Sequence, residues 1–231
     1  VASFGLDGRI CLWDVRSGCL LKELTVNDEY IFSAGFSPDG RVLATSSSDN
    51  IIRIWDLASG EIVEKLPKQP EKTFCIAYSP DNSIFAYAGQ DRLINLRSVR
   101  TGQLLVRLAG HKRSVYTIEF SKNGAMLAST SVDATVRIWN VSQCICERIL
   151  STGRDIEHDF ALSPDWDMLA SVRLEKHICL YDTEPVLLRH KLVGHTDSAL
   201  SIAFSSDGTI LASGSEDHSV RLWSTSSGEC T

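Results

Sequence analysis

Histidine, serine and aspartate occur in this chain at a spacing that invites comparison with a nucleophilic hydrolase. Ser213 would be the nucleophile, His195 its general base, and Asp217 the carboxylate that orients the histidine. Such a triad also requires an oxyanion site beside the serine, and no motif for one accompanies it.

The same residue types recur at the same spacing elsewhere in the chain. In both copies the serine follows the histidine by 18 residues, the aspartate follows the serine by 4, and a tryptophan follows the aspartate by 6. The copies are His111, Ser129, Asp133 and Trp139, then His195, Ser213, Asp217 and Trp223. A duplicated triad without an oxyanion site has no catalytic rationale, so the pattern favours a structural role and predicts that the chain is not an enzyme.

The two copies belong to a longer repeat with a period of 42 residues. A short turn motif, Phe36-Ser37-Pro38-Asp39-Gly40 in its first copy, returns in similar form at positions 78, 120, 162 and 204. A second series keeps the same interval: Trp13, Trp55, Arg97, Trp139, Tyr181 and Trp223. A period of this length indicates repeated supersecondary units.

Each repeat contains four short strand candidates separated by turns. Residues 199–204, 209–215 and 219–223 are three of them, and residues 61–66 and 103–108 show the fourth in earlier repeats. Asp-Gly and Pro-Asp-Gly provide the positive or preset φ that hairpin turns need. The strands are rich in Val, Ile, Leu and Ala, as expected of sheets covered on both faces. These features predict an all-β fold of four-stranded antiparallel units, the pattern of propeller blades.

Several motifs recur in register and together resemble the WD40 repeat family. They are Gly194-His195, Leu211-Ala212-Ser213-Gly214-Ser215, Asp217 and Trp55-Asp56. The resemblance covers residues 1–231 and implies a β-propeller, which in this family usually has seven blades. At 42 residues each, 231 residues hold about 5.5 blades, in units 1–24, 25–66, 67–108, 109–150, 151–192 and 193–231. We therefore expect a partial WD40 propeller that is a fragment of a longer chain.

The resemblance also assigns a role to the histidine, serine, aspartate and tryptophan sets. In WD40 repeats the turn aspartate accepts a hydrogen bond from the histidine, and the serine bridges the histidine to the indole N–H, which ties three strands and a loop together. The network is complete in only two repeats. The others carry Ser3, Asp7 and Trp13; Asn27, Thr45, Asp49 and Trp55; Gln69, Tyr87, Asp91 and Arg97; and Gly153, Ser171, Glu175 and Tyr181. We expect the third and fifth repeats to be less rigid or specialised for a partner.

The family binds peptides or proteins at a face whose exposed positions lie three and five residues after the histidine position. In register, the five-after positions are Phe32, Phe74, Tyr116, His158 and Leu200, and the three-after positions include Tyr30, Lys72 and Ser114. Aromatic clusters are common at interaction hot spots. The three aromatic residues of the five-after series share strand parity with aliphatic residues such as Ile76, so burial in the core is the alternative. Trp166 stands where sister turns carry Gly40, Gly124 or Gly208, and it is a second candidate contact.

The composition narrows the class of ligand. A formal net charge of −6 disfavours nucleic acid, and no apolar run is long enough for membrane insertion. No phosphate-binding loop, metalloprotease motif or zinc-type spacing is present, so we predict no cofactor and no metal. The seven cysteines include no CxxC pair, which favours reduced, mostly buried thiols in the cytoplasm or nucleus.

Together these features predict a non-catalytic scaffold or adaptor that binds proteins or peptides, within a multiprotein complex. Fold alone does not define a pathway, and three other interpretations stay open. The chain could be a regulatory or ligand-sensing propeller of a larger ATPase or protease, or the substrate-recognition part of a ubiquitin ligase. A subunit of an RNA-processing or chromatin assembly is the third, and the acidic balance disfavours it.

Overall fold

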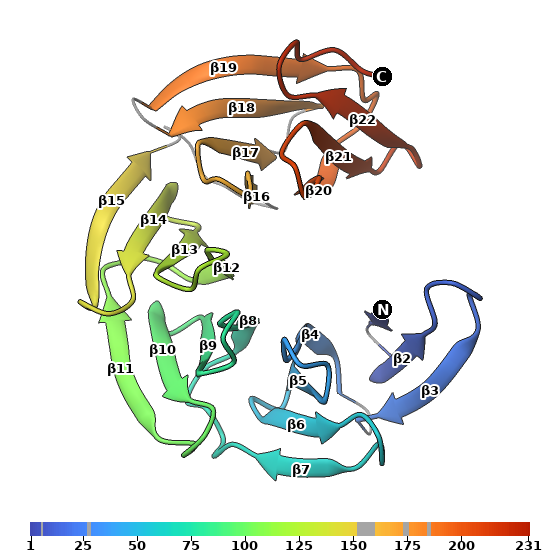
Figure 1. Ribbon diagram of the computed structural model, residues 1–231, viewed down its shortest axis with the longest axis vertical. Helices are drawn as coiled ribbons and strands as arrows, with labels where there is room; N and C mark the ends of the chain where they lie inside the picture. The colour runs from blue at the N-terminus through green and yellow to red at the C-terminus, as the bar shows by residue number, and fades with distance from the viewer. Residues whose placement is uncertain (6, 27–28, 152–159, 173–175, 184–185) are drawn as a thin grey trace. The chain divides into compact units, whose positions relative to one another are not determined.

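The computed structural model describes residues 1–5, 7–26, 29–151, 160–172, 176–183 and 186–231. All regular structure in these residues is β-strand, arranged in six antiparallel sheets (Figure 1). Strands that are consecutive in the sequence pair within each sheet, because short turns join them. The predicted all-β class and its repeated antiparallel unit are therefore confirmed.

The first three sheets use strands β1 to β11. The first contains β1 (Ala2–Phe4), β2 (Arg9–Trp13) and β3 (Leu20–Thr25). The second contains β4 (Ile31–Phe36), β5 (Val42–Ser47), β6 (Ile52–Asp56) and β7 (Ile62–Lys65). The third contains β8 (Thr73–Tyr78), β9 (Ile84–Gly89), β10 (Leu93–Ser98) and β11 (Leu104–Ala109).

The last three sheets use strands β12 to β22. The fourth contains β12 (Val115–Phe120), β13 (Met126–Ser131), β14 (Thr135–Asn140) and β15 (Ile145–Ser151). The fifth contains β16 (Phe160–Leu162), β17 (Met168–Val172), β18 (His177–Thr183) and β19 (Val186–Val193). The sixth contains β20 (Ala199–Phe204), β21 (Ile210–Ser215) and β22 (Val220–Ser224).

The expected count of about 5.5 blades of a probable seven is wrong for this structure, whose described residues form six sheets. Residues 1–24 were expected to be a fraction of a blade, but β1 pairs with β2 and β2 pairs with β3. The last sheet also has three strands, with one further bridge between Trp223 and Cys230. Three paired strands already satisfy most of one another's backbone groups, so a partial repeat forms a sheet of its own.

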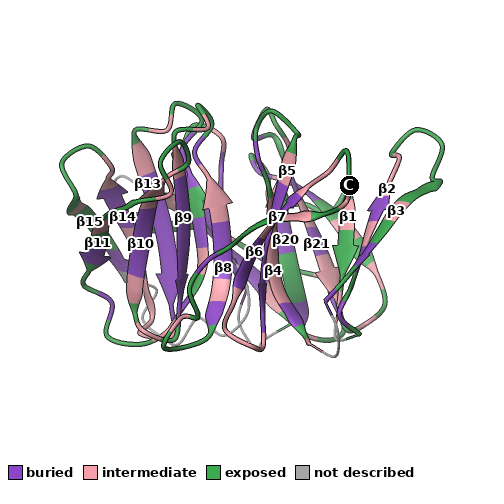
Figure 2. Cartoon of the chain, turned by 90° about the horizontal axis from the view of Figure 1, so that it is seen from below, coloured by how far each residue is buried: buried purple, intermediate pink, exposed green. Residues whose placement is uncertain are grey.

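The strands fall into two compact units, Val1–Ser129 with Asn140–Ile145, and Thr130–Trp139 with Cys146–Thr231. Within the first unit β4 packs beside β8 and β8 beside β12, and strands such as β9 are buried along most of their length (Figure 2). Within the second unit β16 and β17 pack beside β20. In each unit the core is the apolar layer between neighbouring sheets, so each sheet is covered by the next.

One serine-centred turn closes the hairpin between the first and second strands of five sheets. In its first copy the buried Ser37 hydroxyl donates to Asp39 at 2.6 Å and accepts the backbone N–H of Val42 at 3.0 Å. Gly40 then takes a positive φ of 68°. The other copies begin at Ser79, Ser121, Ser163 and Ser205, where the hydroxyl lies 2.5–2.8 Å from the Asp or Asn two residues later. The recurrence of Ser in the turn motif is thus a hydrogen-bonding requirement.

All seven cysteines are free thiols. Only Cys75 and Cys179 are buried, so the expectation that most would be buried is wrong. Cys19, Cys144 and Cys230 are exposed because they lie in or next to turns rather than in covered strands. Burial raises the pKa of the Cys75 thiol well above its usual range, so it stays protonated and behaves as a small apolar side chain.

Candidate functional site

The triad-like residues of the last sheet form one buried hydrogen-bonded chain. His195 Nδ1 lies 2.9 Å from Asp217 Oδ2, and His195 Nε2 lies 2.8 Å from the Ser213 hydroxyl. The indole Nε1–H of Trp223 donates to the same hydroxyl at 2.8 Å. Because the hydroxyl accepts from the indole, its own proton is free to go to Nε2, which places the histidine proton on Nδ1 facing the aspartate. The network therefore connects the loop before β20 to β21, the β21–β22 turn and β22.

Asp217 is held as a carboxylate by groups that surround it. The Ser219 hydroxyl donates to it at 2.6 Å, and the backbone N–H of Thr196 at 2.9 Å. These hydrogen bonds, that of Ser219 first, hold the pKa of Asp217 well below its usual range, outweighing the opposing effect of burial. The carboxylate therefore stays ionised at pH values well below those at which a free aspartate is protonated.

The geometry matches a catalytic triad, but the Ser213 hydroxyl is buried and inaccessible to a substrate. Ser213 is only 1% exposed, and the Trp223 indole that bonds it is equally buried. A substrate carbonyl could not reach the oxygen in this conformation. What the arrangement can do is hold strands together, because each buried polar atom has a partner.

The second copy of the network lies at the fourth sheet. His111 Nε2 is 2.8 Å from the Ser129 hydroxyl, and both side chains are buried. Trp139 is buried as well, and Asp133 accepts from the backbone N–H and the hydroxyl of Thr135.

The repeats that lack the histidine keep part of the network. Trp55 Nε1–H donates to the Thr45 hydroxyl at 2.9 Å, and Trp13 Nε1–H to the Ser3 hydroxyl at 2.8 Å. In the fifth sheet the corresponding hydroxyl, that of Ser171, is buried and has no hydrogen-bond partner in the described part of the chain. The link between indole and hydroxyl is therefore the most widely retained part of the network.

The predicted aromatic residues Phe32, Phe74 and Tyr116 of the first unit lie together in one row of contacting rings. The Phe32 and Phe74 rings meet edge to face with centroids 5.6 Å apart, and Phe74 stacks on Tyr116 at 4.9 Å with an interplanar angle of 7°. Lys72 Nζ lies 5.6 Å from the Phe32 centroid. Phe32 and Phe74 are half-buried, whereas Tyr116 is 45% exposed. We call Phe32, Lys72, Phe74 and Tyr116 the aromatic row.

A β-bulge explains why these rings are not in the core despite their strand parity. Ile31 pairs with Ser47, but the next paired residue of β4 is Ser33, which leaves Phe32 as the extra residue of the bulge. Phe74 in β8 is skipped in the same way. A bulge redirects the side chain of the extra residue, so the parity rule fails at this position. Burial of these rings in the core was the alternative expectation because it assumes a strand whose side chains alternate regularly.

The remaining predicted contact residues are spread more widely. Tyr30 is 52% exposed at the start of β4, and Ser114 is half-buried before β12. Leu200 is exposed at the matching bulge of β20, in the second unit. Trp166 is half-buried at a turn, with φ 67° where three of the sister turns have glycine and the fourth has Asn82. His158 lies outside the described residues, as do Asn27, Gly153 and Glu175.

The repeated antiparallel sheets, their serine-centred turns and the indole–hydroxyl links define a repeat protein built of propeller blades. The model of the family "WD domain, G-beta repeat" matches residues 18–56, 102–140 and 187–224, which together make up about half of the chain. The last two segments contain the two repeats with complete histidine sets. This chain belongs to the WD40 repeat family.

Two curated proteins share about one repeat with the chain. The WD repeat-containing protein pop2 of Schizosaccharomyces pombe is 56% identical over 41 residues, 18% of this chain and 6% of that protein. The vegetative incompatibility protein HET-E-1 of Podospora anserina is 54% identical over 37 residues, 16% of this chain and 3% of that protein. The similarity thus covers a small fraction of either relative's length.

No helix in the described residues is long and apolar enough to cross a membrane. No group of three or more His, Cys, Asp or Glu side chains in the same residues is placed to hold a metal ion.

Proposed function

We propose that this chain is a non-catalytic scaffold that binds a protein or peptide partner through the aromatic row. The observation that carries the proposal is the continuous row of contacting rings, Phe32, Phe74 and Tyr116, across β4, β8 and β12, all of them partly exposed. Family membership supports a role in protein interaction in general, and the row supplies a particular surface for it.

The row has the physical properties of a binding hot spot. Aromatic rings offer a large apolar area with few rotatable bonds, so little conformational entropy is lost when a partner covers them. Here the rings already contact one another, which fixes their orientation before binding. Lys72 beside Phe32 adds a cation at one end of the row, where an acidic group of the partner would be favoured.

The test is a selection that does not require the natural partner. Peptides are selected from a random display library on the immobilised chain, and their affinities are then measured by isothermal titration calorimetry. Phe74→Ala removes the central ring, which contacts both others, and should weaken the selected peptides by roughly 30-fold, as loss of a hot-spot residue does. Phe36→Ala is the matched control, because Phe36 is an exposed ring at the other end of β4.

Thermal unfolding of both variants serves to verify that they fold. If Phe74→Ala and Phe36→Ala bind the selected peptides as tightly as the parent chain, the aromatic row is not the binding surface. If only Phe36→Ala weakens them, the partner docks at the opposite end of the strand and the proposal is wrong.

A further inference from the structure

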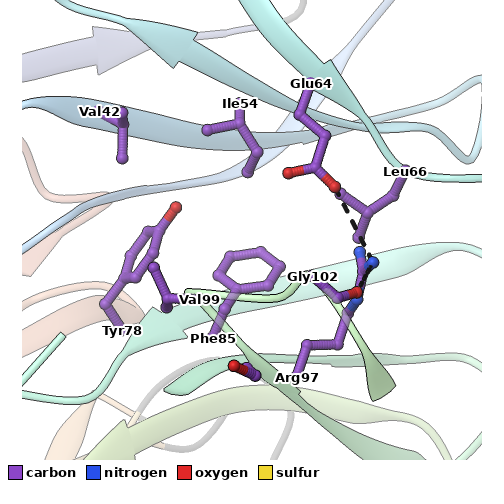
Figure 3. Close-up of a pocket in the computed structure, with 10 residues that line it drawn as sticks. Val42, Ile54, Glu64, Leu66, Tyr78, Phe85, Arg97, Val99 and Gly102 are labelled. Atoms are coloured by element: carbon purple, nitrogen blue, oxygen red, sulfur yellow. Dashed lines mark hydrogen bonds and ion pairs between the residues drawn. The ribbon is translucent and has the colours of Figure 1, made fainter. Parts of the chain in front are cut away.

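A partly open cavity lies between the second and third sheets of the first unit. It measures about 180 Å³, and its walls come from β5, β6, β7, β8, β9 and β10 with the turn after β10 (Figure 3). Val42, Ile54 and Phe85 give it an apolar interior, while Glu64 and Arg97 form a charged side. The cavity is separate from the aromatic row, since none of its lining residues belongs to that set.

The cavity occurs where the repeat departs from its own pattern. In the second sheet the equivalent position holds Trp55, whose buried indole packs with Leu43 and Ile10 and closes the space between sheets. Arg97 takes that position in the third sheet, pairing with Phe85 as Trp55 pairs with Leu43. A guanidinium on a flexible stem does not fill the volume of an indole ring. The substitution therefore explains both the cavity and the cation at its edge.

Arg97 retains hydrogen-bonding capacity toward the cavity. Its Nη2 donates to the carbonyl oxygen of Gly102 and lies 3.9 Å from Glu64 Oε1, at the outer limit of an ion pair. The Arg97 side chain is only 15% exposed, whereas that of Glu64 is 50% exposed and can turn into solvent. A guanidinium has five N–H donors in a planar fork that suits a carboxylate, and few of them are used here.

A second polar group faces the same space. The Tyr78 hydroxyl points toward the wall formed by Val42 and Ile54 (Figure 3). Burial raises the pKa of Tyr78 well above its usual range, so the group is a neutral phenol that can donate or accept. The cavity thus combines an apolar interior with one neutral hydrogen-bonding group and one cation.

We propose that this cavity binds the C-terminal residue of a partner peptide, with its apolar side chain inside and its α-carboxylate on Arg97. An apolar cavity of roughly 150 Å³ holds a benzene ring, so this one has room for a single aromatic or aliphatic side chain. It is smaller than the roughly 300–1,000 Å³ typical of small-molecule sites, which favours one residue of a longer ligand. An Arg next to an apolar space selects an occupant that has both an apolar group and an anion.

The probes are three short peptides: acetyl-Gly-Gly-Phe with a free carboxylate, its C-terminal amide, and acetyl-Gly-Gly-Gly with a free carboxylate. Binding to the whole chain is measured by calorimetry and saturation-transfer NMR. The Phe acid should bind best, with the amide and the Gly acid each weaker by roughly tenfold. Arg97→Met should remove the preference for acid over amide, while Arg100→Met, which removes an exposed arginine nearby, should not.

Glu64→Gln provides a test that does not depend on a buried side chain. Because Glu64 competes with the peptide for Arg97, this variant should bind the Phe acid about two- to fivefold more tightly and the amide unchanged. Phe74→Ala should leave all three affinities unchanged, so failure of this site and failure of the aromatic row are distinguishable.

Several results would overturn the proposal. These are equal binding of acid and amide, weaker binding of the acid by Glu64→Gln, or no binding of any probe at millimolar concentration. Tighter binding of free benzoate than of the Phe acid would also overturn it, because the occupant would then be a small acid and not a chain end.

Discussion

Replacing Ser213 with alanine tests whether the buried network holds the last sheet together. The substitution removes one hydroxyl, which lies 2.8 Å from His195 Nε2 and 2.8 Å from the indole nitrogen of Trp223. The side-chain volume changes by a single oxygen, so the effect reports hydrogen bonding and not packing. Ser171→Ala is the matched control, because Ser171 occupies the same position in the fifth sheet and its hydroxyl has no hydrogen-bond partner among the described residues.

The expected loss of stability follows from the two groups that lose their hydrogen-bond partner, His195 Nε2 and the indole N–H of Trp223. Each buried donor or acceptor that loses its partner costs about 1–3 kcal/mol, and Ser213→Ala leaves two such groups. Because neighbouring losses are not additive, we expect the free energy of unfolding to fall by about 3 kcal/mol. For a domain of this size that corresponds to a decrease in Tm of roughly 6–12 °C. Ser171→Ala should lower the free energy of unfolding by about 0.5 kcal/mol or less, or raise it, since it removes a buried hydroxyl that no described residue satisfies.

The assay is equilibrium urea unfolding followed by far-UV circular dichroism. Calorimetry then verifies that the Tm of Ser213→Ala is below those of the parent chain and Ser171→Ala. The urea dependence of the free energy should be the same in all three proteins, so that the midpoints compare stability alone. If the two alanine variants unfold at the same urea concentration, the hydrogen bonds of Ser213 contribute nothing measurable. The structural role assigned to the network would then be refuted, and its conservation between two repeats of this chain would need another cause.

Two further predictions concern the first unit. Gly8 and Gly18 share a φ of 69°, but a Cβ at Gly8 would lie 2.4 Å from the Val26 carbonyl oxygen, and one at Gly18 would meet nothing within 4 Å. Gly18→Ala should therefore cost about 1 kcal/mol in urea unfolding and Gly8→Ala at least about 2 kcal/mol more, and equal costs would contradict the steric argument. For Asp49, burial is outweighed by hydrogen bonds from Arg53 and Ser47, which lower its pKa to about 2. A lowered pKa stabilises the fold above pH 3.8 and loses that effect as pH falls toward 2, so the parent chain should exceed Asp49→Asn by about 1 kcal/mol at pH 6 and by almost nothing near pH 2. A difference that does not depend on pH would mean that the Asp49 charge is not the stabilising feature.

Much of the fold could be predicted from the sequence because each repeat carries the same local sequence features. The strand expected at 199–204 is β20 with the same bounds. The strand expected at 209–215 begins one residue before β21, and the one expected at 219–223 is displaced by one residue from β22. Turn chemistry at Asp-Gly and the alternation of apolar residues are local properties, so they can be read from one segment at a time. Dividing the chain length by the repeat period gives too few sheets. A shortened repeat still forms a sheet of its own when its strands are paired by hydrogen bonds.

The candidate site was harder to predict because it depends on departures from regular geometry. The positions of Phe32 and Phe74 were found by register, but their exposure depends on bulges that alternation alone does not reveal. A bulge at the same place in β4, β8 and β20 is a property of the repeat, so it could be anticipated once one copy is known. The contacts between the rings could not be predicted from the sequence, because they depend on how adjacent strands β4, β8 and β12 are spaced.

Arg97 shows how a repeat architecture can produce a site without altering its framework. The pairing of β9 with β10 is the same as that of β5 with β6, although tryptophan has become arginine. The backbone tolerates the change because the sheet is held by its ladder and its turns, and the side chain at this position mainly closes the space beside the next sheet. Losing the indole therefore costs packing at one wall and leaves the strands in place. A position that is structural in one repeat can in this way become a binding position in another, which makes departures from the repeat, more than the repeat itself, the places to look for specificity.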